Sequence, residues 1–149
     1  MAVLRYVVGV DDTEQSARAV RTACRLAHCV GAEVHAVHVA HVPSGMLSVL
    51  AGVPAAAADY VEADRAAVWA KIGPVIDDIG APVLRVDLEG YPSDTLVSYA
   101  AEVGAAMIVV GSRGRGDLAS LVLGSTSHRV VNHAHCDVLI AKGESEETP

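Results

Sequence analysis

Short runs rich in valine and isoleucine alternate with longer stretches of helical periodicity along this chain. That order is typical of a parallel sheet whose strands are joined by helical crossovers. The run from Ala106 to Val110 reads Ala-Met-Ile-Val-Val without polar alternation, which indicates a strand buried on both faces in the middle of a sheet. The sequence therefore predicts an α/β fold, an open five-stranded parallel sheet of Rossmann-like type with helices on both faces.

Apolar periodicity and turn residues give the expected element boundaries. Strands are predicted at residues 4–10, 34–39, 83–88, 106–110 and 137–141. Helices are predicted at about 14–29, from about 59 onward, at about 92–103 and at about 124–133. Gly31 is expected to end the first helix, as glycine does after a helix C-terminus.

Proline and glycine divide the middle of the chain. The stretch 41–58 is apolar but contains two prolines and two glycines, and we interpret it as a mobile connection. Its apolar part around Met46 and Leu50 suits a lid, a partner surface or a flexible insertion equally well. The helix that follows is expected to be interrupted near Gly73-Pro74, because proline removes a backbone donor and clashes with the preceding turn.

The chain length of 149 residues fits one domain, which we assign to residues 1–142, followed by an acidic tail at 143–149 that is expected to be disordered. There is no phenylalanine and only one tryptophan, so the core must be built from small aliphatic side chains. No signal peptide is recognised, and no apolar run reaches the roughly 18 residues that a membrane span needs. A soluble protein without a membrane partner is expected.

Charge and cysteine usage exclude several classes of function. A net charge of −7 with only 11 lysines and arginines provides no basic face for nucleic acid. Three cysteines without CxxC spacing suggest neither a disulfide framework nor a zinc site. A reducing cytoplasm is the compartment that fits.

A glycine-rich segment, Gly111 to Asp117, directly follows the buried strand, and Gly124-Ser125-Thr126-Ser127 begins the next helix. Ligands of open α/β sheets lie beyond the carboxyl ends of the strands. Glycines let backbone N–H groups approach a phosphate, and a helix N-terminus favours an anion. Either feature alone could simply turn the chain or cap the helix, but together they favour a polyphosphate site. Ser125 and Thr126 would add hydroxyl donors, and Arg113 or Arg115 would add positive charge.

Gly111, Gly114, Gly124 and Ser125 are spaced as Gly, two residues, Gly, nine residues, Gly, Ser or Thr. This pattern resembles the ATP-binding signature of the universal stress protein family. The similarity extends to residues 7–11, 37–39, 90–92 and 136–140. It implies an adenine nucleotide alpha hydrolase-like fold and a cytoplasmic regulator of the stress response that binds ATP, with or without Mg²⁺.

The resemblance also implies roles for individual residues. Asp11 would contact the adenosine, Val39 would pack near the adenine, and ribose and phosphates would be held by Gly111, Ser112, Gly114, Gly124 and Ser125. Gly9, Arg113 and Thr126 complete the expected site. Asp11 could equally cap the following helix, and Val39 could belong to the core.

Members of this family often dimerise through the last strand, so a homodimer through the C-terminal strand is expected. Two departures from the family pattern are Ala106, where Asp is common, and Asp137, where Pro is common. Asp137 places a charge beside the expected dimer strand.

No catalytic residue is assigned, because there is no Walker Gly-Lys-Ser/Thr and no clear general base. Binding itself is the expected function, with slow ATP hydrolysis or cyclic-nucleotide binding as alternatives. A phosphoryl-accepting receiver domain is the rival from another class, since Asp11, Asp87, Ser112 and Lys142 occupy suitable positions.

Seven histidines raise the question of a metal site. The pairs to consider are His35 with His38 and His133 with His135. The first pair is expected on opposite faces of a strand, and the second lies at a helix end without nearby carboxylates. No metal ligand is therefore assigned.

Overall fold

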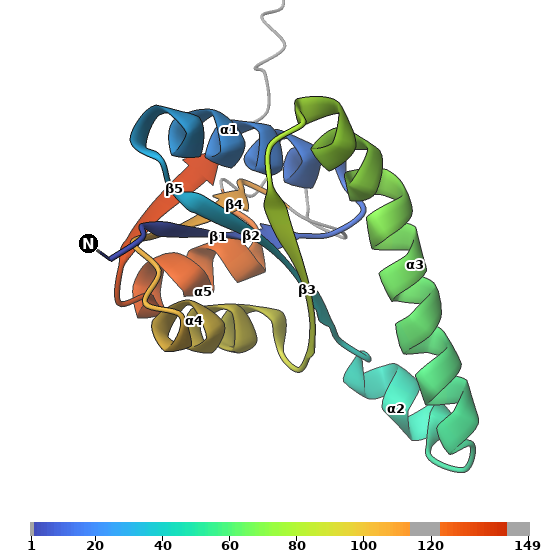
Figure 1. Ribbon diagram of the computed structural model, residues 1–149. Helices are drawn as coiled ribbons and strands as arrows, with labels where there is room; N and C mark the ends of the chain where they lie inside the picture. Colours follow the sequence, from blue (N-terminus) through green and yellow to red (C-terminus); the bar gives the residue numbers. More distant parts are fainter. Residues whose placement is uncertain (1, 114–122, 143–149) are drawn as a thin grey trace, which may run out of the picture.

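The computed structural model describes residues 2–113 and 123–142 (Figure 1). In chain order the elements are β1 (Arg5–Val10), α1 (Glu14–Val30), β2 (Glu33–Ala40), α2 (Ser44–Leu50), α3 (Pro54–Ile79), β3 (Val83–Glu89), α4 (Pro92–Glu102), β4 (Met107–Gly111), α5 (Ser125–His133) and β5 (Asp137–Ala141). The five predicted strands are confirmed, with ends that differ by one residue at most. The tail at 143–149 lies outside the described residues.

The strands form one parallel sheet in the order β3-β2-β1-β4-β5. The predicted fold is therefore confirmed. From β1 the chain adds β2 and β3 on one side, then returns to place β4 and β5 on the other. Such a reversal marks the position where ligands bind in doubly wound sheets. Receiver domains have the order 2-1-3-4-5, so the receiver interpretation is wrong.

Helices cover both faces of the sheet, with α1 and α3 on one side and α4 and α5 on the other (Figure 1). Two clusters of buried side chains lie between these layers, and alanine, valine and isoleucine supply most of both. Val7 and Val8 of the central strand β1 are fully buried and point into different clusters. The expected core of small aliphatic side chains is confirmed. Among the described helices, none combines the length and the hydropathy that a bilayer crossing would need.

The interpretation of residues 41–58 as a connection without regular structure is wrong, because α2 and the start of α3 lie there. Between Gly45 and Gly52 no residue breaks a helix, and Pro54 occupies the first turn of α3, where its missing N–H costs nothing. All of α2 lacks buried residues. It lies with the start of α3 beyond the carboxyl end of β2 (Figure 1).

The expected interruption at Gly73-Pro74 is also wrong, since α3 continues through Pro74. Proline cannot donate to the carbonyl of Ala70, but Pro74 and Ala70 are both exposed, so water can pair with that carbonyl. On the opposite side of the helix, α3 buries Val68, Ile72, Gly73 and Ile76. This apolar packing offsets a proline penalty of about 3 kcal/mol.

At the end of α1, Gly31 adopts a left-handed conformation with φ of 70°, and its N–H donates to the carbonyl of Ala27. No atom lies within 4 Å of the position that a Cβ would take. Gly31→Ala should therefore lower the free energy of unfolding by roughly 1 kcal/mol through backbone conformation alone. Gly45→Ala is the control, because Gly45 has equal space and lies in a helix without a positive φ. Urea unfolding of both variants gives the comparison, and equal losses would contradict the explanation.

Candidate functional site

A cleft with a volume of about 350 Å³ opens at the carboxyl edge of the sheet, where β1 and β4 are neighbours. The ends of three strands, the start of α5 and one side of α3 contribute to it. Its lining residues are Gly9, Val10, Asp11, Ser16, Val37, His38, Val39, His41, Pro43, Tyr60, Asp64, Pro92, Leu96, Val110, Gly111, Arg113, Gly124, Ser125, Thr126 and Ser127. The cleft thus lies at the reversal point of the strand order.

Hydrogen bonds bring the end of β4 next to the start of α5. The N–H of Gly124 donates to the carbonyl of Ser112 at 2.7 Å, and the N–H of Ser112 donates to the carbonyl of Ala141 at 3.1 Å. The buried hydroxyl of Ser127 donates to the carbonyl of Gly111 at 2.5 Å. Two segments that are separated in the sequence therefore form one wall. Gly114, the second glycine of the motif, lies outside the described residues.

The first turn of α5 suits an anion. Gly124 is its N-cap and, among residues 2–113 and 123–142, no side chain caps it, and the first N–H groups of a helix lack intrahelical acceptors. Ser125 is exposed and Thr126 half-buried, and both line the cleft together with the exposed Arg113. This end of the cleft combines a helix N-terminus, hydroxyl groups and a cation.

Asp11 lines the cleft and also organises the start of α1. Its Oδ1 accepts from the N–H of Thr13 at 2.9 Å, from the hydroxyl of Ser16 at 2.8 Å and, in a short contact, from the hydroxyl of Thr13. The N-cap itself is Thr13, whose side chain accepts from the N–H of Ser16. Asp11 therefore supports the helix start and also lies on the cleft wall.

Gly9 and Gly111 are required by packing. A Cβ on Gly9 would lie 2.8 Å from Leu96 Cδ2 and 3.3 Å from Val110 Cγ1. A Cβ on Gly111 would lie 3.0 Å from Gln15 Cβ and 3.3 Å from the carbonyl oxygen of Arg113. These glycines let α4 and α1 approach the strand ends closely.

Of the predicted residues, Ser112 is not on the cleft wall. Its side chain is buried, because its backbone bonds to Ala141 and Gly124 hold it between β5 and α5. Val39 is half-buried and does line the cleft. Met46 and Leu50 do not line it, and among residues 41–58 only His41 and Pro43 do.

Tyr60 and Asp64 of α3 were missed by the sequence reasoning, as was His38. The first two lie about 20 residues beyond the end of β2, so no strand-end rule points to them. His41 and Pro43 come directly after β2, and this position was a signal that could have indicated them. The far end of the cleft is therefore lined by β2, the residues after it and α3.

The histidines of β2 point in different directions, as predicted. His35 Nδ1 lies 2.9 Å from the hydroxyl of Tyr99 on α4, whereas His38 faces Asp64 on α3. His133 is exposed at the end of α5, and His135 follows that helix. Within residues 2–113 and 123–142 no three His, Cys, Asp or Glu side chains gather as metal ligands would.

Comparison with known proteins decides the family, because the universal stress protein family model matches residues 4–142. The chain belongs to the universal stress protein family. A universal stress protein of Methanocaldococcus jannaschii is 28% identical over 148 residues, which are 96% of this chain and 84% of that protein. One of Bacillus subtilis is 28% identical over 145 residues, 93% of this chain and 98% of that protein.

Solved structures agree with the fold of this universal stress protein. UspA of Lactobacillus plantarum has a TM-score of 0.80 at 20% identity, over 95% of this chain and 99% of that one. A universal stress protein crystallised in complex with cAMP has a TM-score of 0.68 at 27% identity, over 94% of this chain and 97% of that one.

Ser127→Ala should lower the free energy of unfolding by about 1 to 3 kcal/mol, because it leaves the buried carbonyl of Gly111 without its donor. Ser125→Ala is the matched control two residues earlier, where the side chain is exposed and stability should not change. Chemical denaturation measures both. A Ser127 variant as stable as the wild type would contradict the proposed link between β4 and α5.

Proposed function

We propose that this universal stress protein binds an adenine nucleotide, ATP in the first place, and acts as a regulator in the stress response through binding rather than turnover. The observation that carries the proposal is the cleft at the strand reversal, which joins an anion-favouring helix start to a wall that includes the apolar side chains of Val37 and Val39. The relative crystallised with cAMP supports an adenine compound as the ligand.

The two ends of the cleft suit the two ends of a nucleotide. Arg113 and the first turn of α5 would hold the phosphates, since positive charge and N–H groups without intrahelical acceptors gather there. Val39, with Val37 behind it, offers apolar contact to a base, while Asp11 offers an acceptor for ribose or base donors. Gly114 is part of the proposed site on sequence grounds only.

The identity of the ligand is tested first by denaturing freshly purified protein and identifying any released small molecule by mass spectrometry. Calorimetry with ATP, AMP and cyclic AMP, each with and without Mg²⁺, then ranks the ligands. ATP should bind most tightly. A higher affinity for cyclic AMP would favour the alternative that the cAMP-bound relative suggests, and no binding of any of the three would overturn the proposal.

Arg113→Gln separates the phosphate contacts from the nucleoside contacts. The variant should weaken ATP binding about fivefold to tenfold, as the loss of one favourable charge contact of about 1 kcal/mol predicts, and leave adenosine binding unchanged. Arg25→Gln on the exposed side of α1 is the control for net charge. Equal weakening of ATP and adenosine by Arg113→Gln would contradict the assignment of this end to phosphate.

A homodimer through β5 is part of the proposal. In the described part of the chain this strand pairs with β4 on one side and ends the sheet on the other, and that outer edge is where a second strand would pair. Asp137 begins the strand and is exposed. Size-exclusion chromatography with light scattering should give twice the chain mass of 15.4 kDa. A monomeric mass would reject the homodimer and leave nucleotide binding untouched.

We also place the protein in the reducing cytoplasm, since Cys24, Cys29 and Cys136 are all free thiols. Burial raises the pKa of the Cys24 thiol, and burial with the neighbouring charge of Asp137 raises the pKa of Cys136. Neither is therefore poised for redox chemistry.

A further inference from the structure

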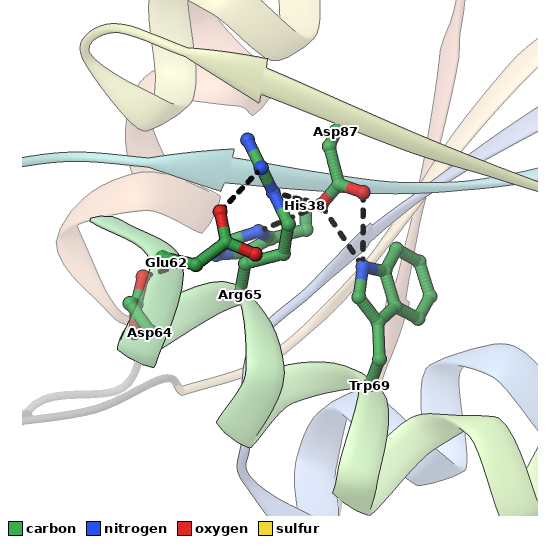
Figure 2. A network of polar contacts seen from close by, with 6 residues as sticks. All are labelled: His38, Glu62, Asp64, Arg65, Trp69 and Asp87. Carbon is green, nitrogen blue, oxygen red and sulfur yellow. Dashed lines mark hydrogen bonds and ion pairs between the residues drawn. The ribbon is translucent and has the colours of Figure 1, made fainter. Parts of the chain in front are cut away.

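A polar network ties α3 to the sheet beside the cleft (Figure 2). His38 of β2 is only 1% exposed, and a carboxylate faces each of its ring nitrogens. Nε2 lies 3.0 Å from Asp64 Oδ2 on α3, and Nδ1 lies 3.2 Å from Asp87 Oδ1 on β3. The side chain of Asp64 is 9% exposed. One imidazole thus joins three elements.

Further groups from α3 converge on Asp87. The indole N–H of Trp69 donates to both carboxylate oxygens, at 2.9 and 3.1 Å. Arg65 Nε lies 3.4 Å from Asp87 Oδ1 in an ion pair, and Arg65 Nη1 donates to Glu62 at 3.0 Å. Figure 2 shows these side chains reaching from α3 toward Asp87. Asp87 is the anchor of α3 on β3.

The network lies where apolar packing of α3 ends. The buried residues of this helix begin at Val68, whereas residues 54–67 are half-buried or exposed. Tyr60 and Asp64, which line the cleft, belong to that less buried part. This wall therefore lies beside the polar network and outside the buried apolar packing of α3.

We propose that His38 is a positioning residue of the nucleotide cleft, which holds the Tyr60–Asp64 wall of α3 in place by bridging Asp64 and Asp87. The inference rests on the proposed function for its ligand. His38 acts through Asp64 and Tyr60, so its loss should change nucleotide affinity without removing any phosphate contact.

The chemistry of the bridge explains why a histidine is needed. Ionised carboxylates only accept hydrogen bonds, so both ring nitrogens donate only when the imidazole carries both protons. The imidazolium then places one positive charge between two negative ones. Without it, Asp64 and Asp87 would lose the donor that they share, and Arg65 and Trp69 would have to tie this part of α3 to Asp87.

His38→Gln is the first test, measured by calorimetry with ATP. The glutamine amide can donate to one carboxylate, but its carbonyl oxygen then faces the other, and affinity should fall about tenfold. His35→Gln is the matched control: it makes the same substitution at a buried position of the same strand, remote from the cleft. Its affinity should stay within about twofold of the wild type. Equal affinities of all three proteins would overturn the inference while leaving the proposed function intact.

A second variant distinguishes positioning from a general loss of stability. In the double variant His38→Gln with Asp64→Asn, the asparagine amide introduced on α3 can donate to the oxygen of the glutamine introduced on β2. The amide group of that glutamine can at the same time donate to Asp87, so both contacts of the bridge are restored. Most of the lost affinity should return. If the double variant loses as much binding free energy for ATP as the two single variants lose together, the bridging role is contradicted.

Trp69 provides a readout that does not need a ligand, because it is the single tryptophan of the chain and contacts Asp87 directly. In ligand-free protein, His38→Gln should change the Trp69 emission and speed amide exchange in residues 54–67, whereas His35→Gln should do neither. If no nucleotide binds the wild type, the proposed function fails, and these two measurements still decide the inference. Unchanged exchange in His38→Gln would overturn it.

Discussion

The reversal of strand order between β1 and β4 is the constraint on which the rest of the structure depends. It separates the crossovers that lead from these two strands, so their carboxyl ends bound an open cleft between layers of helix. Asp11 at the end of β1 and Gly111 at the end of β4 lie on its walls for this reason. The start of α5 completes the cleft because its hydrogen bonds join it to β4 and β5.

A core without large aromatic side chains makes this arrangement compact. Alanine and valine let α1 and α4 pack close to the sheet, and glycine at positions 9 and 111 removes the last obstacle at the strand ends. The glycines that resemble a ligand motif thus also satisfy packing. Close approach brings the helix starts near the ligand space, so packing and the proposed binding depend on the same positions.

The third helix is held differently along its length. Its second part packs through Val68, Ile72 and Ile76. The hydrophobic effect that stabilises this packing is non-directional. Its first part depends on directional contacts from His38 and Asp87. Directional contacts are more sensitive to geometry than apolar packing is.

The alternation of apolar runs and helical periods determined the five strands and the α/β class, and the spacing of Gly111, Gly124 and Ser125 indicated the family, because each of these signals lies within a short segment of the sequence. The phosphate-favouring segment and Asp11 were predicted for the same reason. The sequence did not predict the helices within 41–58, the continuity of α3 through Pro74 or the buried side chain of Ser112. Solvent exposure and tertiary contacts decided these features. Only the tertiary structure placed His38 between Asp64 and Asp87, because strand register and the path of α3 join residues that lie far apart in the sequence.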